Sequence, residues 1–219
     1  MHAVSRTRGQ LAHALSITFS VALVPASVAQ AAEPVTPPPG IQCSYCETGI
    51  PLGEFVLESS GPAVLTVDPS GAGETLEQEG IRLRVRIGCD GVPAAGAPGA
   101  EIVLWNPSLA WCTTPFMAAQ ATDADGWTEF TGTIRAGGCA ERLILFADGI
   151  RMAEIPLRIN SPDTGTASPG AVDAGDLPAL AERIGEPARY SFCFDYNEDG
   201  AIDAGDVARF AQSLGGHCP

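Results

Sequence analysis

The chain has 219 residues, with 26 Asp or Glu against 12 Lys or Arg and a formal net charge of −14. A surface this acidic repels phosphate backbones, which argues against nucleic acid as a partner. The length suits one medium-sized domain or two small ones.

The first 31 residues have the features of a signal peptide. Arg6 and Arg8 precede the apolar stretch Leu11–Val24, and an A-x-A cleavage site ends at Ala31. No later stretch reaches the roughly 18 apolar residues of a membrane span. We therefore expect a secreted, extracellular protein, free or associated with a cell surface and without a membrane span. Its composition, rich in Ala, Gly and Pro, suggests a bacterial source.

Residues 32–54 form a proline-rich leader that contains a C-x-x-C motif at Cys43 and Cys46. Such a motif can be half of a zinc site, a redox pair or part of a disulfide framework. The chain has no second C-x-x-C, and His217 is the one histidine after the signal peptide. Disulfide formation is therefore the favoured interpretation.

All seven cysteines follow residue 31, and an odd number leaves one of them free or intermolecular. Cys89 has Cys43 and Cys46 as possible partners, and Cys112 has Cys139. The sequence leaves this pairing open.

The region from residue 55 to 160 reads as a series of short strands. Ile81–Ile87 alternates apolar residues with arginines, as a half-buried antiparallel strand does. Asp90-Gly91, Asp125-Gly126 and Asp148-Gly149 are hairpin-turn signals. About six or seven short strands with such turns predict an antiparallel β-sandwich. The expected strands are Ala63–Val67, Ile81–Ile87, Ile102–Trp105, Thr128–Ile134, Leu143–Phe146 and Ile150–Ile159.

Two sequence motifs in this region resemble those of a known protein family. They are GVPAAGAP from Gly91 to Pro98 and TDADGWTEF from Thr122 to Phe130. Together they resemble the bacterial Ig-like repeats of invasin-type surface proteins, which implies a spacer or adhesive unit and not a catalyst. Asp123 and Asp125 also begin a calcium-loop pattern, but position 12 would fall on Ile134, so a hairpin turn is the better interpretation.

The region from residue 161 to 219 contains a duplication with a period of thirty residues. AVDAGDL begins at Ala171 and AIDAGDV at Ala201. Each copy is followed by apolar residues at the spacing of one helix face, here called a stripe. Gly185 and Gly215 stand where a helix ends. We expect the two helices to pack face to face. The stripes are Leu177, Leu180, Ala181 and Ile184, then Val207, Phe210, Ala211 and Leu214.

The stretch DYNEDGAIDAGD from Asp195 to Asp206 has the pattern of an EF-hand calcium loop. Oxygen-bearing side chains fall at loop positions 1, 3, 5, 9 and 12, and Gly200 at position 6, although Asp206 replaces the usual Glu. Calcium requires six to eight oxygen ligands, and position 6 requires a conformation that glycine adopts freely. The sequence therefore predicts a calcium site, with a solvated acidic turn as the alternative.

A tandem of such loops, each followed by one helix, resembles a dockerin module, and the resemblance covers residues 161–219. The resemblance implies that calcium is bound by the side chains of Asp195, Asn197, Asp199 and Asp206. It also implies that Ala201 contributes its backbone carbonyl, and that Asp203 acts through a water molecule or caps a helix.

The first copy departs from the pattern because fourteen residues run from Asp163 to Asp176, two more than a calcium loop holds. Asp163, Asp173 and Asp176 form at most a weak second site, and helix capping is a sufficient role for the last two. A disulfide between Cys193 and Cys218 would staple the second copy.

The preferred prediction is a secreted, calcium-stabilised structural or binding protein that is not an enzyme. Its fold is mainly β with a small α module: an Ig-like sandwich, then a dockerin-like pair of loop–helix units that packs on it or binds a cell-surface protein. The alternative is a dockerin-bearing component that a cohesin scaffold tethers in polysaccharide degradation. However, the Ala-Gly pairs at 174–175 and 204–205 lack the hydroxyls of cohesin-binding loops. A glycoside hydrolase built on Glu101, Asp123 and Glu129 is the least favoured reading.

Overall fold

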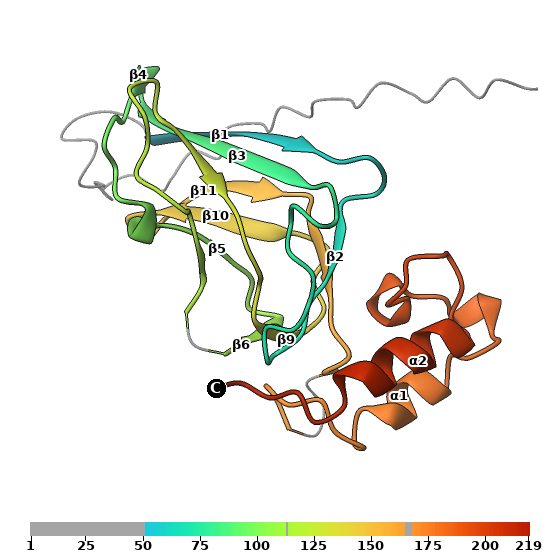
Figure 1. The fold of residues 1–219 in the computed structure, drawn as a ribbon. Coiled ribbons are helices and arrows are strands. Elements are labelled where there is room, and N and C mark those ends of the chain that lie inside the picture. Colours follow the sequence, from blue (N-terminus) through green and yellow to red (C-terminus); the bar gives the residue numbers. More distant parts are fainter. Residues whose placement is uncertain (1–50, 113, 165–167) are drawn as a thin grey trace, which may run out of the picture.

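The computed structural model describes residues 51–112, 114–164 and 168–219, so the expected signal peptide and the C-x-x-C motif lie outside the described residues. All named strands lie between residues 51 and 160, and both α-helices lie after residue 160 (Figure 1). The prediction of a mainly β protein with antiparallel sheets and few helices is confirmed at this level.

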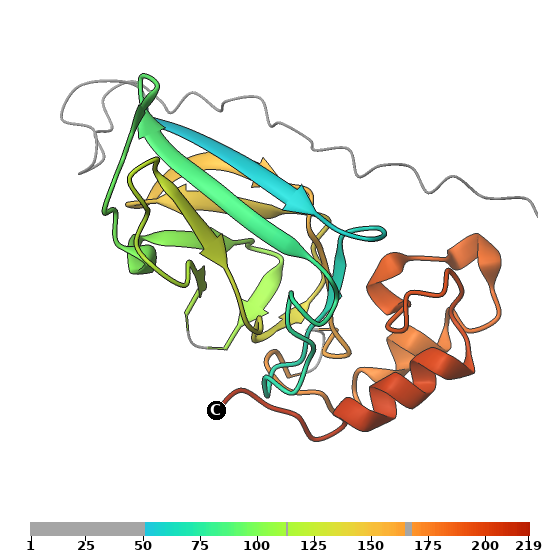
Figure 2. The same ribbon diagram turned by 45° about the horizontal axis from the view of Figure 1, so that its top comes forward.

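Two four-stranded antiparallel sheets face each other (Figure 2). In the first sheet, the central strand β3 pairs with three others; the strands are β1 (Pro51–Glu58), β3 (Arg82–Cys89), β4 (Val92–Pro93) and β8 (Trp127–Phe130). The second sheet runs in the order β11 (Ile150–Ile155), β10 (Leu143–Ala147), β5 (Ile102–Trp105) and β7 (Phe116–Met117), and a 3-10 turn, η1 (Gly99–Glu101), precedes β5.

Two smaller sheets lie at the end of this β module (residues 51–160) that faces the helices. One pairs β2 (Val64–Thr66) with β12 (Arg158–Asn160) in parallel, and the other pairs β6 (Leu109–Trp111) with β9 (Ala136–Gly138). Both therefore bring segments far apart in the sequence to the side where the last 59 residues dock.

The core of the β module lies between the two large sheets. Leu83, Val85 and Ile87 of β3 belong to the same buried cluster as Leu104 of β5 and Leu145 of β10. The alternation in β3 thus places its apolar residues inside, as predicted. Its arginines lie on the outer face, with ion pairs from Arg82 to Glu129 and from Arg86 to Glu54.

The Asp-Gly dipeptides form the expected turns. In the β3–β4 and β10–β11 connections both turn residues have positive φ: 47° and 82° at Asp90 and Gly91, 49° and 74° at Asp148 and Gly149. This is the conformation of a two-residue hairpin turn. Before β8, the Asp123 carboxylate accepts the backbone N–H groups of Asp125 and Trp127, both at 2.9 Å. Asp123 therefore holds a turn, as predicted.

Some strand boundaries differ from the prediction. Strand β1 begins at Pro51, so the last four residues of the expected leader belong to the β module. The run expected to reach Ile134 ends at Phe130. The run from Ile150 to Ile159 divides into β11 and β12, because Pro156 lacks the N–H group that a continuous ladder needs.

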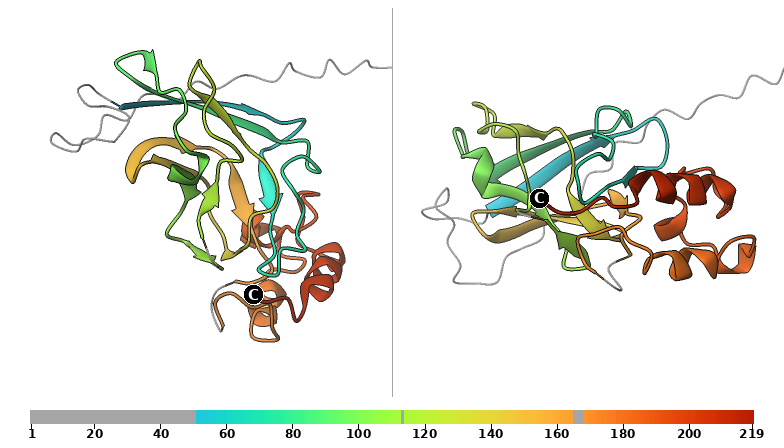
Figure 3. Two further views of the ribbon diagram at one scale, coloured as in Figure 1. Left: turned by 60° about the vertical axis from the view of Figure 1, so that its left-hand side comes forward. Right: turned by 60° about the horizontal axis from the view of Figure 1, so that its bottom comes forward.

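Residues 161–219, here called the C-terminal module, have a separate small core. Helix α1 (Leu177–Ala181) lies beside α2 (Ala204–Ser213), and two 3-10 turns, η2 (Pro187–Arg189) and η3 (Phe192–Phe194), connect them (Figure 3). The predicted face-to-face packing holds only at Leu180 and Phe210, which are buried together. The other expected contact residues Leu177, Ile184 and Leu214 are 41%, 39% and 55% exposed, and α1 ends at Ala181 instead of Ile184. The buried cluster consists of Val172, Leu180, Tyr196, Ile202 and Phe210.

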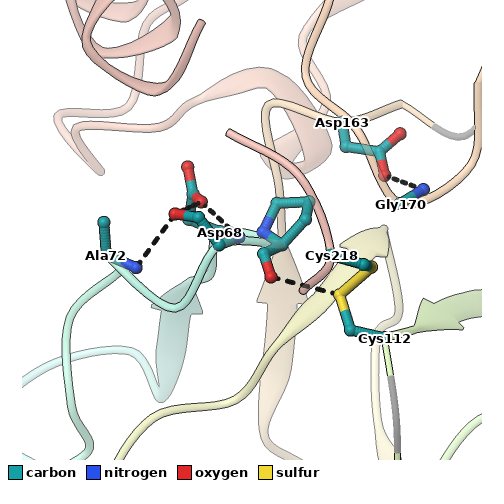
Figure 4. The surroundings of a disulfide bond; sticks show 8 residues. Asp68, Ala72, Cys112, Asp163, Gly170 and Cys218 are labelled. Carbon is teal, nitrogen blue, oxygen red and sulfur yellow. Dashed lines mark hydrogen bonds between the residues drawn. A yellow bond between two sulfur atoms is a disulfide. The ribbon is translucent and has the colours of Figure 1, made fainter. Parts of the chain in front are cut away.

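Two disulfides join the β module to the C-terminal module. Cys112 bonds Cys218 (Figure 4), and Cys139 bonds Cys193. The predicted Cys193–Cys218 bridge is therefore wrong, and so is the pairing of Cys112 with Cys139. Each of these cysteines reaches across the boundary instead, because the two modules pack against each other. Cys89 is also disulfide-bonded.

Close backbone contacts accompany the disulfides. Gly137 and Gly138 lie in β9, against Asp163 of the C-terminal module. A Cβ atom on Gly137 would lie 1.8 Å from the Asp163 carboxylate, so only glycine fits there. The Gly138 N–H donates to the Asp163 carbonyl at 2.6 Å. The two modules are thus in direct backbone contact.

Asn160, the last residue of β12, is the main polar side chain at this junction. Its side chain is fully buried, and its amide donates to the carbonyls of Phe192 and Asp195, both at 2.9 Å. The Thr66 hydroxyl donates to the carbonyl of Tyr196 at 3.2 Å beside it. Side chains from both strands of the parallel β2–β12 pair therefore bind the backbone that enters the second loop.

We expect Asn160→Ala to lower the free energy of unfolding by about 1–3 kcal/mol, because two buried carbonyls lose their donor. Urea unfolding of the full chain would measure this change. Asn106→Ala is the matched control, since the Asn106 amide donates to one exposed carbonyl, that of Arg142. Equal losses in the two variants would contradict a special role for Asn160.

Candidate functional site

The C-terminal module has an approximate two-fold arrangement in which each half completes the other. The Gly185 N–H, after α1, donates to the carbonyl of Ile202 in the second loop at 3.1 Å. The Gly215 N–H, after α2, donates to the carbonyl of Val172 in the first loop at 2.9 Å. Both glycines have positive φ, 71° and 87°, as helix-terminating glycines do. The sequence duplication is therefore also a structural one.

The second loop winds around the carboxylate of Asp195, which is 3% exposed. Its two oxygens accept the N–H groups of Asp199 at 3.1 Å and Gly200 at 3.0 Å, and the Tyr190 hydroxyl donates to it at 2.9 Å. Gly200 has a φ of 87°, which confirms the expected conformation at loop position 6. All three groups that bind Asp195 are neutral donors.

The carboxylate of Asp206 is fully buried at the start of α2. It accepts backbone N–H groups from Tyr196 at 2.6 Å, Asn197 at 3.3 Å and Asp203 at 2.8 Å. Burial raises the pKa of Asp206, the three N–H bonds lower it, and the nearby Asp195 carboxylate raises it further. The two buried carboxylates thus repel each other, and neither forms an ion pair among the described residues.

The remaining predicted ligands lie on the outer side of this loop. Asp203 caps α2, since its carboxylate accepts the Gly205 N–H at 2.7 Å within a capping box. The Asn197 amide donates to the exposed carboxylate of Asp199 at 2.8 Å, and the other oxygen of Asp199 accepts the Ala201 N–H at 2.9 Å. Across the described part of the chain, no three or more His, Cys, Asp or Glu side chains converge as metal ligands.

The first loop repeats the hydrogen bonds of the second despite its two extra residues. Gly170 donates to Asp163 at 2.7 Å, Thr164 and Asp173 donate to Asp176 at 2.9 and 3.0 Å, and Gly175 donates to Asp173 at 2.6 Å. These bonds correspond to those from Gly200, Tyr196, Asp203 and Gly205 in the second loop. The Asp163 and Asp176 carboxylates are both fully buried. Residues 165–167 lie outside the described residues.

Tyr196 lies between the two loops and was not singled out by the sequence. Its ring is 2% exposed, and its hydroxyl has no hydrogen-bond partner among the residues described. Burial raises the pKa of this phenol well above its usual range, and the carboxylates of Asp176, Asp206 and Asp163 raise it further. The phenol therefore stays protonated beside three buried carboxylates. No sequence pattern near Tyr196 indicates that its phenol lies buried beside these carboxylates.

The three carboxylates considered for glycoside hydrolysis occupy separate elements. Glu129 of β8 pairs with Arg82, at 2.8 Å between the carboxylate and guanidinium. Asp123 holds the turn before β8, and Glu101 lies in η1. His217 is exposed near the C-terminus, where its ring lies 3.1 Å from the Gly215 carbonyl. Glu129 and Asp123 thus have structural partners.

Comparisons with known proteins return no match: no family model, no curated protein and no solved structure is similar to this chain. Within the part of the chain that the structure describes, no helix has the length and apolar character to cross a membrane.

Proposed function

We propose that this is an exported calcium-binding structural protein, in which a calcium ion in the loop Asp195–Asp206 stabilises a dockerin-like C-terminal module locked to an Ig-like sandwich. One observation carries the proposal: the carboxylates of Asp195 and Asp206 are buried near each other and accept hydrogen bonds from neutral donors alone. Buried like charges are costly without a compensating cation.

The candidate ligands of the loop are of the chemical type that calcium prefers. Every candidate ligand supplies oxygen, which hard divalent cations prefer. The residues that would hold the ion are Asp195, Asn197, Asp199, the carbonyl of Ala201, and Asp206, while Asp203 serves as the helix cap. A bound calcium ion would supply the positive charge that this site lacks. Ligation by Asn197 and Asp199 would replace their mutual hydrogen bond, which is exposed and therefore weak.

The junction favours a tail that packs on its own β module over a tail that tethers cargo to a cohesin. Two disulfides and the buried Asn160 amide hold the C-terminal module in place. A tethering module needs freedom to reach a separate scaffold. The two facing sheets are compatible with the proposed Ig-like sandwich, which would serve as a spacer or adhesive unit.

Calorimetric titration of calcium into the full exported chain, with its disulfides intact, tests the proposal. We expect one site in the wild type, and Asp199→Ala should weaken it by about tenfold or more through loss of a charged ligand. At a calcium concentration of about 100 times the Kd, the free energy of unfolding should rise by about 2.7 kcal/mol.

Asp125→Ala is the matched control for this titration. Asp125 is an exposed aspartate in the turn before β8, and it should leave calcium binding unchanged. No binding at millimolar calcium would refute the proposed function. Two equal sites would show instead that the first loop also binds calcium, against our prediction.

A further inference from the structure

A groove of about 650 Å³ lies where the two modules meet. The β module contributes Asn106, Ser108, Arg142 and Arg158, and the C-terminal module contributes Tyr190 and Phe192. Neither module forms this groove alone. The Cys139–Cys193 disulfide is part of its wall, so the relative position of the two sides is covalently fixed.

Arg158 gives the groove an uncompensated positive charge. Its side chain is exposed, and its guanidinium lies 5.2 Å from the centre of the Phe192 ring. It forms no ion pair with any carboxylate in the described residues. The Phe192 carbonyl in turn accepts the buried Asn160 amide at 2.9 Å. The ring that orients Arg158 is therefore itself held by the module junction.

A second guanidinium lines the same groove. Arg142 shares the carboxylate of Glu154 with Arg151, so one carboxylate serves two arginines. Glu141 is an exposed acidic residue that also lines the groove. Together with Arg158, these side chains leave a local excess of about one positive charge in a chain whose net charge is −14.

The uncharged lining groups suit a ligand with both polar and apolar parts. Asn106 is fixed at the rim, since its amide donates to the Arg142 carbonyl at 2.7 Å and its oxygen accepts the Ser108 N–H at 2.8 Å. The Ser108 hydroxyl has no hydrogen-bond partner among the described residues, so it can bind a ligand. Tyr190 and Phe192 supply aromatic surface.

From this arrangement we infer that the groove binds a small carboxylate ligand, with its carboxylate on Arg158 and Arg142 and its carbon skeleton against Phe192 and Tyr190. A guanidinium matches a carboxylate with two parallel hydrogen bonds. A single carboxylate balances the local charge excess, whereas a doubly charged phosphate overbalances it in a protein that is already acidic.

Calorimetric titration of the full oxidised chain with four probes tests this inference: hippurate, its uncharged methyl ester, galacturonate and inorganic phosphate. We expect hippurate or galacturonate to bind, and the ester and phosphate to bind at least about tenfold more weakly. Tighter binding of hippurate than of galacturonate would assign the ligand to aromatic or peptide acids, and the reverse order to sugar acids.

Arg158→Gln should weaken carboxylate binding by about tenfold to a hundredfold, through the loss of a charge-assisted contact. Arg84→Gln is the matched control, because the Arg84 guanidinium also lies over an aromatic ring, 5.0 Å from the centre of Trp127, but on the far sheet. The inference is overturned if neither carboxylate binds at 10 mM, if phosphate binds most tightly, or if both variants bind like the wild type. A thermal unfolding scan of each variant confirms that it is folded.

Discussion

Replacing both Cys139 and Cys193 by alanine lowers the free energy of unfolding by about 4 kcal/mol, the expected effect of releasing a loop whose ends are 54 residues apart. This disulfide ties η3, immediately before the second loop, to the end of β9. Its loss frees the unfolded chain and removes the covalent link beside the groove. Urea unfolding of the oxidised full chain measures the change.

Hydrogen exchange on the same variant shows whether losing the Cys139–Cys193 disulfide loosens one module or the whole chain. Hydrogen exchange should accelerate mainly in the C-terminal module, whose small core depends on the junction, and much less in β3 and β10. Cys112→Ala with Cys218→Ala is the companion variant, since that bond closes a separation of 106 residues. A loss below about 1 kcal/mol for Cys139 and Cys193 would mean that noncovalent contacts alone hold the modules together.

Phe210→Ala should lower the free energy of unfolding by about 3–5 kcal/mol, because it empties the centre of the C-terminal module. Phe210 is 4% exposed and packs with Leu180 and Tyr196 in the small core. Leu214→Ala, one turn further along and 55% exposed, is the control and should change stability by less than about 0.5 kcal/mol.

Calcium titration of the Phe210→Ala variant adds a second measurement. Helix α2 carries Asp206 in its first turn, so loosening the helix should also weaken calcium binding. If both alanine variants unfold at the same urea concentration as the wild type, the duplicated helices do not form a cooperative core.

Local signals in the sequence predicted the elements well. The Asp-Gly turns and the alternation in β3 each depend on residues close together in the chain, whose conformational preferences act wherever the segment lies. The helical spacing located both helices, but most of the apolar residues expected on their packed faces are exposed. The disulfide pairing could not be predicted in this way. It depends on which face of the β module the C-terminal module covers, and no short-range pattern encodes that choice.

In the candidate site, too, the sequence predicted features of short segments better than contacts between distant ones. The Gly200 conformation followed from the loop pattern, because it is a property of a short segment. The Asp203 cap is one of the two roles that the dockerin resemblance implied for this residue. The duplication already placed Asp163 and Asp176 at the ends of the first loop, as Asp195 and Asp206 are at the ends of the second, but the two extra residues left it open whether the first loop keeps the same arrangement. The shared hydrogen bonds show that it does.

The two disulfides between the modules are nested, since the pair 139–193 lies inside the pair 112–218. A protease that cuts the backbone once anywhere between residues 112 and 218 therefore leaves the two fragments covalently joined, and a cut between residues 139 and 193 leaves them joined twice. Both modules, and the groove between them, stay in one molecule after the backbone is broken.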